Sequence, residues 1–168
     1  MSGRAFVFGD NIDTDVLAPG YLMKLPAAEL ASHCLQAVDP DFAKSVRPGD
    51  VVVAGANFGL GSSREQAAVS LKLLGVSAVL ATSFARIFYR NAINLGLPAI
   101  VFPKASEVSA GDQIVVDPEA GLIENLTQAR IYTVSPIPSH LMAMIRDGGL
   151  MPHLKRRLQV SAGAGAPE

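Results

Sequence analysis

The sequence predicts an α/β domain in which a mixed parallel and antiparallel, barrel-like sheet is flanked by helices. Its middle part indicates the parallel half, since the apolar runs 50–54 and 77–81 each precede a segment of helical character, 62–74 and 83–95. The apolar run 98–102 then follows as a third strand. Strands that alternate with helices favour a parallel sheet with right-handed crossovers.

The C-terminal part carries an antiparallel pattern. Two short runs, 113–117 and 122–124, flank Pro118-Glu-Ala-Gly121, and this predicts a hairpin because proline and glycine favour tight turns. The other expected elements are a strand over 5–8, a helix over 27–36, a strand over 129–134 and a helix over 139–146.

The length of 168 residues suits one hydrophobic core. We expect residues 1–158 to form a single domain. Residues 159–168 are small, polar and rich in Gly and Ala, so we expect them to be a disordered tail.

Composition narrows the classes of partner. A formal net charge of −1 gives no attraction for a polyanion, so nucleic acid is not expected. No stretch approaches the roughly 20 apolar residues of a membrane helix. The first residues reach Gly9-Asp10 before the core of a signal peptide is formed. We therefore expect a cytoplasmic protein without a membrane partner.

Cysteine and histidine usage argues against a metal site on this chain. Cys34 is the only cysteine, which excludes an internal disulfide and a zinc-binding cysteine pair. A cubane cluster normally needs several thiolates, so this chain is not expected to hold one. His33, His140 and His153 are far apart in sequence, and no two have the spacing of metal ligands.

The segment Asn57-Phe-Gly-Leu-Gly-Ser-Ser-Arg-Glu65 predicts an anion site. A strand that leads through a glycine-rich turn into a helix start presents free backbone N–H groups at the positive end of the helix dipole. Gly59 and Gly61 allow a ligand to approach the backbone closely, and the fork of Arg64 suits a carboxylate. The alternative is purely structural, because Ser62 with Glu65, and Ser63 with Gln66, have the spacing of a capping box.

Residues 9–24 form a second candidate, an aperiodic loop that contains Asp10, Asp13 and Asp15. The glycine and glutamate that a calcium loop requires are missing, so calcium binding is not expected. Turn formation by the aspartates is the alternative to a functional role.

Residues 83–91 form the third candidate. Ser83 is a plausible N-cap, and Phe84, Ile87 and Phe88 share one helix face, as core residues do. Arg86 and Arg90 are like charges one turn apart, which is unfavourable unless an anion lies nearby. A solvated basic face is the alternative.

These three segments, in this order, resemble the swivelling-domain subunits of the aconitase superfamily, most nearly the small-subunit family of 3-isopropylmalate dehydratase. The residues that carry the likeness are Gly9-Asp-Asn-Ile-Asp-Thr-Asp15, Asn57-Phe-Gly-Leu-Gly-Ser-Ser-Arg-Glu65 and Ser83-Phe-Ala-Arg-Ile-Phe-Tyr-Arg-Asn91. It extends from about residue 4 to residue 155 and implies a swivelling β/β/α domain.

The resemblance also implies a function. Such a hydro-lyase isomerises 2-isopropylmalate and 3-isopropylmalate in leucine biosynthesis by removing and re-adding water. A separate large subunit, in a heterodimer or heterotetramer, carries the [4Fe–4S] cluster, and this chain binds none. Ser62 corresponds to the catalytic serine base and Asp15 to an acid near the site. Ser63 and Arg64 correspond to residues that hold a carboxylate of the hydroxy-diacid.

The resemblance also bears on the substrate, through the loop that contains Met23 and Lys24. In this family the loop around Met23 contacts the variable group, and relatives with arginine there act on tricarboxylates. Met23 is apolar and favours an alkyl group, whereas Lys24 keeps open a homoaconitase or a methyl-substituted malate dehydratase. The chain departs from the family at Leu60, where cysteine is usual, and at Gln66, where histidine is usual. A non-catalytic anion-binding module of the same fold is the alternative from another functional class.

Overall fold

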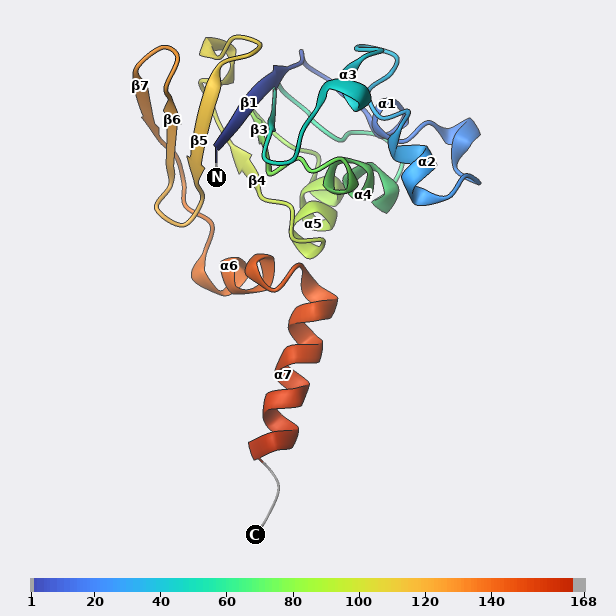
Figure 1. The fold of residues 1–168 in the computed structure, drawn as a ribbon, viewed down its shortest axis with the longest axis vertical. Coiled ribbons are helices and arrows are strands. Elements are labelled where there is room, and N and C mark those ends of the chain that lie inside the picture. Colours follow the sequence, from blue (N-terminus) through green and yellow to red (C-terminus); the bar gives the residue numbers. More distant parts are fainter. Residues whose placement is uncertain (1, 165–168) are drawn as a thin grey trace.

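Four parallel strands form one half of a seven-stranded sheet, and an antiparallel meander forms the other half (Figure 1). The computed structural model describes residues 2–164, to which all structural statements below refer. The order of strands in the sheet is β4-β3-β2-β1-β5-β6-β7. The parallel strands are β1 (Ser2–Val7), β2 (Val51–Ala54), β3 (Ala78–Ala81) and β4 (Ala99–Val101). The antiparallel strands are β5 (Gln113–Asp117), β6 (Leu122–Asn125) and β7 (Arg130–Thr133).

Strand β1 joins the two halves by changing partners along its length. Residues 2–4 pair antiparallel with β5, whereas residues 5–7 pair parallel with β2. The sheet curls at this junction into a half-barrel whose two edges are β4 and β7. The predicted fold class, a mixed barrel-like sheet with flanking helices, is confirmed.

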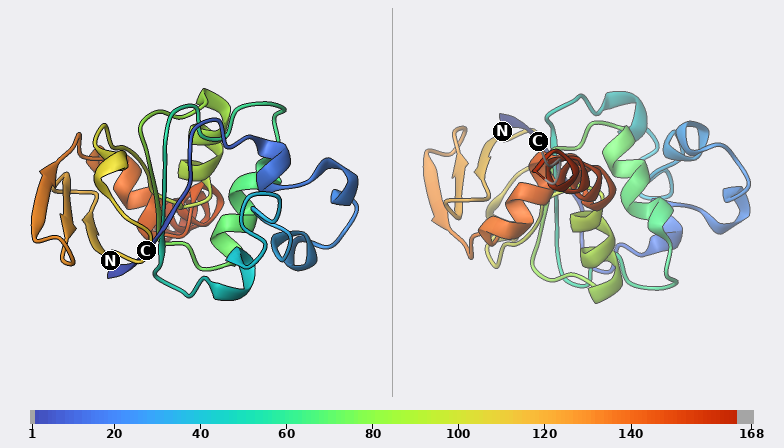
Figure 2. Two further views of the ribbon diagram at one scale, coloured as in Figure 1. Left: turned by 90° about the horizontal axis from the view of Figure 1, so that it is seen from above. Right: turned by 90° about the horizontal axis from the view of Figure 1, so that it is seen from below.

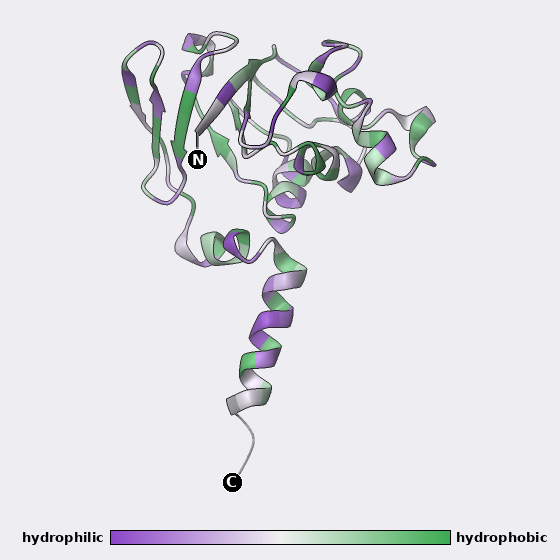
Figure 3. Ribbon diagram, in the orientation of Figure 1, coloured by the Kyte–Doolittle hydropathy of each residue, from purple (hydrophilic) through white to green (hydrophobic). Residues whose placement is uncertain are grey.

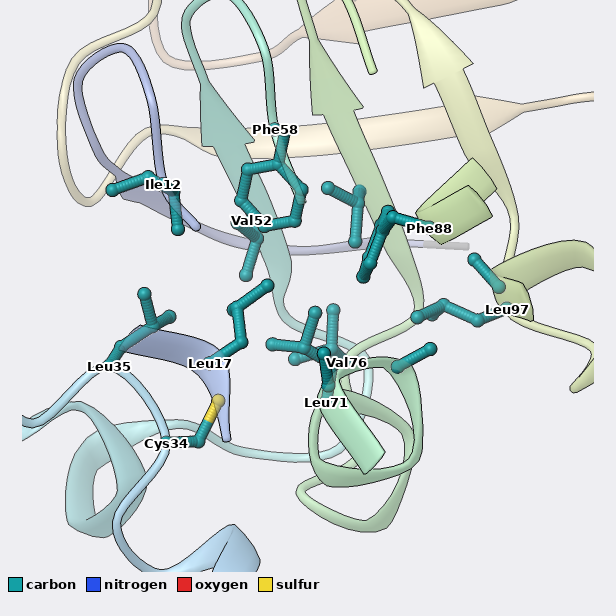
Figure 4. Packing of buried hydrophobic residues seen from close by; sticks show 14 of the residues in the cluster. Ile12, Leu17, Cys34, Leu35, Val52, Phe58, Leu71, Val76, Phe88 and Leu97 are labelled. Atoms are coloured by element: carbon teal, nitrogen blue, oxygen red, sulfur yellow. The ribbon is translucent and has the colours of Figure 1, made fainter. Parts of the chain in front are cut away.

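The central parallel strands β2 and β3 are buried on both faces, as their unbroken apolar runs require. On one face, Val52 packs in a core with Leu71 and Phe88 (Figure 4). On the other face, Val53 packs with Ile114 of the antiparallel half. Figure 3 shows the resulting concentration of apolar residues in the central strands. The strands are therefore held rigidly, and the loops at their ends are positioned with them.

Helices cover the sheet and extend beyond it (Figures 1 and 2). Those before the second strand are α1 (Thr14–Leu17), η1 (Gly20–Leu22), α2 (Ala27–Ala31) and α3 (Phe42–Ser45). Those after it are α4 (Glu65–Leu73), α5 (Arg86–Asn94), η2 (Ala105–Glu107), α6 (Ser139–Arg146) and α7 (Leu150–Ala164). None of the helices in residues 2–164 is both long enough and apolar enough to cross a membrane.

The helix predicted over 27–36 is much shorter in the structure, and residues 159–164 of the expected tail are helical. The helix expected over 27–36 ends at Ala31 because the chain turns there, and Leu35 adopts a φ of 61° and donates its N–H to Val16 O. The tail expected to be disordered from residue 159 instead continues α7 to Ala164, and residues 165–168 lie outside the described part. Asp147 fixes the start of α7, accepting from His153 Nδ1 at 2.7 Å and from Arg156 Nη1 at 2.6 Å.

Candidate active site

The three candidate segments meet at one edge of the sheet, where β1, β2 and β3 end. The carboxyl ends of neighbouring parallel strands lie at the same edge, which is where α/β proteins usually bind ligands. Residues 8–15 leave β1, residues 55–64 leave β2 and residues 82–85 leave β3. The sheet order explains why these three segments lie close together.

Backbone hydrogen bonds lock the first two segments together. Gly59 N–H donates to Ile12 O at 2.7 Å, and Thr14 N–H donates to Leu60 O at 2.8 Å. Farther from the site, Asp10 Oδ1 accepts the N–H of Ala56 at 2.7 Å. The first loop therefore fixes the conformation of the glycine-rich loop.

The third segment is tied to the glycine-rich loop in the same way. Phe58 N–H donates to Ser83 O at 3.0 Å, and Ala85 N–H donates to Phe58 O at 2.9 Å. Ser83 Oγ accepts the N–H of Asn57 at 2.8 Å. Ser83 is therefore not the N-cap of α5 as expected; Ala85 holds that position, without a side-chain cap.

A cavity of about 300 Å³ opens between the glycine-rich loop and α5. Its lining residues are Thr14, Gly59, Gly61, Ser62, Arg64, Ala85, Arg86, Ile87, Phe88 and Asn91. Of the predicted site residues, the structure thus brings Gly59, Gly61, Ser62 and Arg64 to one cavity.

Ser62 and Ser63 are exposed, and within residues 2–164 neither hydroxyl is hydrogen-bonded to protein. The helix expected from residue 62 begins only at Glu65, with Arg64 as N-cap and without a side-chain cap. The capping-box alternative is therefore wrong for both serines. Ser62 lines a cavity that is also bounded by the start of α5, and the anion site stays a prediction.

Arg64 is oriented by Asp15. Arg64 Nη1 donates to Asp15 Oδ1 at 2.8 Å and to Ala18 O at 3.1 Å. Asp15 Oδ1 also accepts the N–H of Gly20 at 2.8 Å. The hydrogen bond from Gly20, followed by that from Arg64, lowers the pKa of Asp15 below its usual value, so this carboxylate is ionised at neutral pH.

Asp15 does not line the cavity, and its carboxylate contacts Arg64, which does. Its predicted catalytic role stays a prediction. Asp13 has a local role, since its Oδ1 accepts the N–H of Val16 at 2.8 Å and caps α1. The local, turn-forming role therefore holds for Asp13, whereas Asp15 combines a local contact with Gly20 N–H and a long-range contact with Arg64.

The glycine-rich loop needs Gly59 for two reasons. Its φ of 83° is rarely adopted by residues with a side chain, and a Cβ built there would lie 2.3 Å from Phe88 Cβ. Gly61 has a φ of 105°, and a Cβ there would lie 3.2 Å from Thr14 Oγ1. Both glycines let the loop pass close to neighbouring residues while Ser62 stays accessible.

Met23 and Lys24 are not brought to this cavity. Met23 closes η1 and is half-buried against the core that includes Leu17 and Leu30. Lys24 is exposed. Their predicted part in choosing the substrate stays a prediction.

Sequence reasoning did not assign site roles to Thr14, Arg86, Ile87 or Asn91, which line the cavity. Ile87 was expected in the core, but it is 48% exposed. One feature of the sequence did point toward Arg86. It forms a pair of like charges with Arg90 one helical turn away, and such a pair is unfavourable unless an anion lies nearby.

Within residues 2–164, no group of three or more His, Cys, Asp or Glu side chains is arranged to hold a metal ion. Cys34 is buried in the core, and this burial raises the pKa of its thiol. Its position gives no thiolate near the cavity.

Comparison with known proteins identifies the family. Residues 35–105 match the model of the aconitase C-terminal domain. The 3-isopropylmalate dehydratase small subunit of Moorella thermoacetica is 48% identical over 96% of this chain and 98% of its own length. The chain belongs to the 3-isopropylmalate dehydratase small-subunit family of the aconitase superfamily.

Two further members of that family bear on structure and substrate. The crystal structure of 3-isopropylmalate dehydratase from Methanocaldococcus jannaschii superposes with a TM-score of 0.92 at 42% identity, covering 98% of both chains. The methanogen homoaconitase small subunit of Methanothermobacter thermautotrophicus is 50% identical over 91% of this chain and 89% of its own. Relatives with different substrates are thus about equally similar to this chain.

Proposed function

We propose that this chain is the small subunit of a cytoplasmic hydro-lyase that interconverts 2-isopropylmalate and 3-isopropylmalate in leucine biosynthesis. The names of its relatives as small subunits imply a large-subunit partner. The observation that carries the proposal is the accessible, uncommitted hydroxyl of Ser62 in a cavity that also contains Arg64.

Ser62 is suited to move the carbon-bound proton. As an oxyanion it takes the proton from the carbon next to a carboxylate as water is lost, and it returns the proton when water is re-added. A serine hydroxyl ionises only with strong local stabilisation. Arg64 and the unpaired N–H groups at the start of α5 supply positive charge around the same cavity.

Arg64 and Ser63 are proposed to hold a substrate carboxylate. Because Asp15 and Ala18 occupy Arg64 Nη1, the guanidinium has a fixed orientation, with its other N–H groups left for a ligand. The backbone around Gly59 and Gly61 allows the ligand to lie close to the loop. Binding and orientation are thus supplied by groups that need little rearrangement.

Family membership implies a [4Fe–4S] cluster, and the residues of this chain do not fit one. Cys34 is the only thiol in the sequence and lies in the core. We therefore place the cluster on the large subunit, which this chain would join in a heterodimer or heterotetramer.

The proposed substrate is the alkyl-substituted diacid, supported by the apolar side chains of Ile87 and Phe88 in the cavity. The part of Met23, which lies outside this cavity, rests on the family resemblance alone. A homoaconitase or methyl-substituted malate dehydratase subunit is the second candidate, supported by the similarity to the homoaconitase subunit and by the exposed Lys24.

The test is reconstitution with the large subunit of the same organism. After treatment with iron and sulfide, we expect dehydratase activity only when both chains are present, and no cluster absorbance on this chain alone. Turnover is compared for 3-isopropylmalate, citramalate and homoisocitrate. Tight diacid binding by this chain, with no turnover in an intact cluster-containing complex, would instead support a non-catalytic anion-binding module.

A further inference from the structure

The start of α5 supplies a second cation to the cavity that contains Ser62. Arg86 lines it together with Ile87, Phe88 and Asn91, whereas Ser62 and Arg64 line it from the glycine-rich loop. Arg86 is exposed, and no carboxylate within residues 2–164 lies within ion-pair distance of its guanidinium. Arg64, by contrast, already has Asp15 as its partner.

The position of Arg86 in the helix is electrostatically unfavourable in the absence of a ligand. It is the first residue of α5, whose first turn contains no acidic residue and has no side-chain cap. The first backbone hydrogen bond of the helix is donated by Tyr89 N–H to Ala85 O at 3.0 Å. The N–H groups of residues 86–88 and the Arg86 guanidinium are therefore positive groups gathered at one place.

Arg90 adds to this excess of positive charge. It lies one turn farther along α5, where like charges destabilise a helix. An anion at the start of α5 would be attracted by the dipole and both arginines, with Arg86 nearest to it. Asn91 adds a half-buried amide to the same cavity. The positive groups at the start of α5 therefore suit a carboxylate, beside the apolar side chains of Ile87 and Phe88.

Arg64 accounts for only one carboxylate. Its Nη1 is occupied by Asp15 Oδ1 and Ala18 O, so only part of its donor set faces a ligand. The hydroxy-diacid of the proposed reaction carries two carboxylates on adjacent carbons, and Arg86 is the other cationic side chain that lines the cavity. We propose that Arg86, assisted by the start of α5, binds this second carboxylate across the cavity from Arg64, an inference that rests on the proposed function.

The helix provides its own matched control. Arg86→Gln and Arg90→Gln remove the same charge from exposed positions one turn apart, but only Arg86 lines the cavity. In the complex with the large subunit, we expect Arg86→Gln to raise KM for the diacid roughly 10- to 100-fold, the loss typical of a charge-assisted hydrogen bond. Arg90→Gln should stay within about twofold of the unaltered enzyme, and neither variant should unfold at a lower temperature than that enzyme, because each removes an unfavourable charge.

A substrate probe separates carboxylate binding from a structural effect. Each carboxylate of the diacid is replaced in turn by a carboxamide, giving two monoamides. Arg86→Gln should lose its penalty for one monoamide and keep it for the other, and Arg86→Lys should recover part of the KM for the diacid. Equal effects of Arg86→Gln and Arg90→Gln, or the same penalty for both monoamides, would overturn the inference. If the complex without any substitution turns over no diacid, the proposed function itself is refuted.

Discussion

Asp15 Oδ1 lies 2.8 Å from Arg64 Nη1, so a carboxylate in α1 contacts a guanidinium that lies 49 residues later and lines the cavity. The Asp15 side chain is 65% exposed and that of Arg64 22% exposed. An ion pair this accessible contributes little to stability, because water screens it. Its effect should therefore be seen in substrate binding.

Asp15→Ala should raise KM roughly tenfold through loss of the charge-assisted contact that holds Arg64, with a smaller change in kcat. Asp15→Asn keeps an oxygen acceptor for Arg64 and Gly20, and should recover part of the KM. Steady-state kinetics of the reconstituted complex measure both. If Asp15→Ala lowered kcat by orders of magnitude at unchanged KM, Asp15 would take part in the chemistry directly.

The pH dependence of this contact follows from the lowered pKa of Asp15. A carboxyl whose pKa is lower in the folded state keeps its bonds above the unfolded value and loses them as pH falls through the folded value. The amide proton of Gly20, which donates to Asp15, should therefore keep a constant chemical shift from pH 7 down to about 4, and move only at lower pH. A midpoint above about 4 in an NMR titration would contradict the ion pair.

Ser62→Ala should lower kcat by several orders of magnitude at nearly constant KM, because it removes the proposed base and leaves Arg64 in place. The structure adds a prediction about stability. Because Ser62 caps no helix, the variant should unfold within about 1 °C of the unchanged chain, whereas loss of a true N-cap costs about 1 kcal/mol and shifts Tm by about 2–4 °C. Ser63→Ala, which should mainly raise KM, is the control.

Gly59 and Gly111 allow backbone strain to be separated from steric conflict. Both have positive φ, 83° and 87°, but a Cβ at Gly111 meets nothing within 4 Å, whereas one at Gly59 meets Phe88. Gly111→Ala should cost roughly 1 kcal/mol of unfolding free energy, and Gly59→Ala about 2–4 kcal/mol together with activity. Denaturant unfolding of the two variants measures the difference. Equal losses would show that the contact with Phe88 does not constrain Gly59.

The fold was largely predictable because strong apolar runs fix strands irrespective of distant contacts. The run Val51–Ala54 had to be a buried strand, and Gln113–Asp117 was predicted with its observed bounds. Helix starts were predicted less well. Ser62 and Ser83 are of the residue type that caps helices, but neither does so here. The conformation of the glycine-rich loop keeps Ser62 outside α4, and Ser83 instead accepts a hydrogen bond from Asn57 N–H. Both arrangements depend on neighbouring strands.

The site was predictable where a motif carries its chemistry within a few residues, as around Ser62 and Arg64. The part played by Asp15 could not be assigned from spacing, because its partner lies on a different strand connection. The sequence showed only that Arg86 is close to another positive charge. Its position at the cavity could not be predicted, because that position depends on how α5 packs beside the glycine-rich loop. Long-range packing thus limits the prediction of which polar residues share a site.

Specificity is predicted to respond to Met23→Arg. Burying an isopropyl group rather than a hydrogen is worth about 1.5–3 kcal/mol, or roughly 10- to 150-fold in kcat/KM. A carboxylate in an apolar pocket lacks a partner, whereas arginine would pair with it and be left unpaired beside an alkyl group. The ratio of kcat/KM for 3-isopropylmalate to that for homoisocitrate should therefore reverse.

Two controls make this change interpretable. Met23 is half-buried against the core, so Met23→Gln measures the loss of packing without adding charge, and it should lower both rates without reversing their ratio. The double variant Met23→Arg/Lys24→Ala removes the neighbouring Lys24 ammonium. If this ammonium already binds the carboxylate, the single variant Met23→Arg changes the substrate preference less than the double variant does. An unchanged ratio in Met23→Arg would place the selecting residue elsewhere. On this chain the candidate is then Ile87, which presents an apolar side chain to the cavity, and Ile87→Ala should lower kcat/KM for 3-isopropylmalate more than for citramalate.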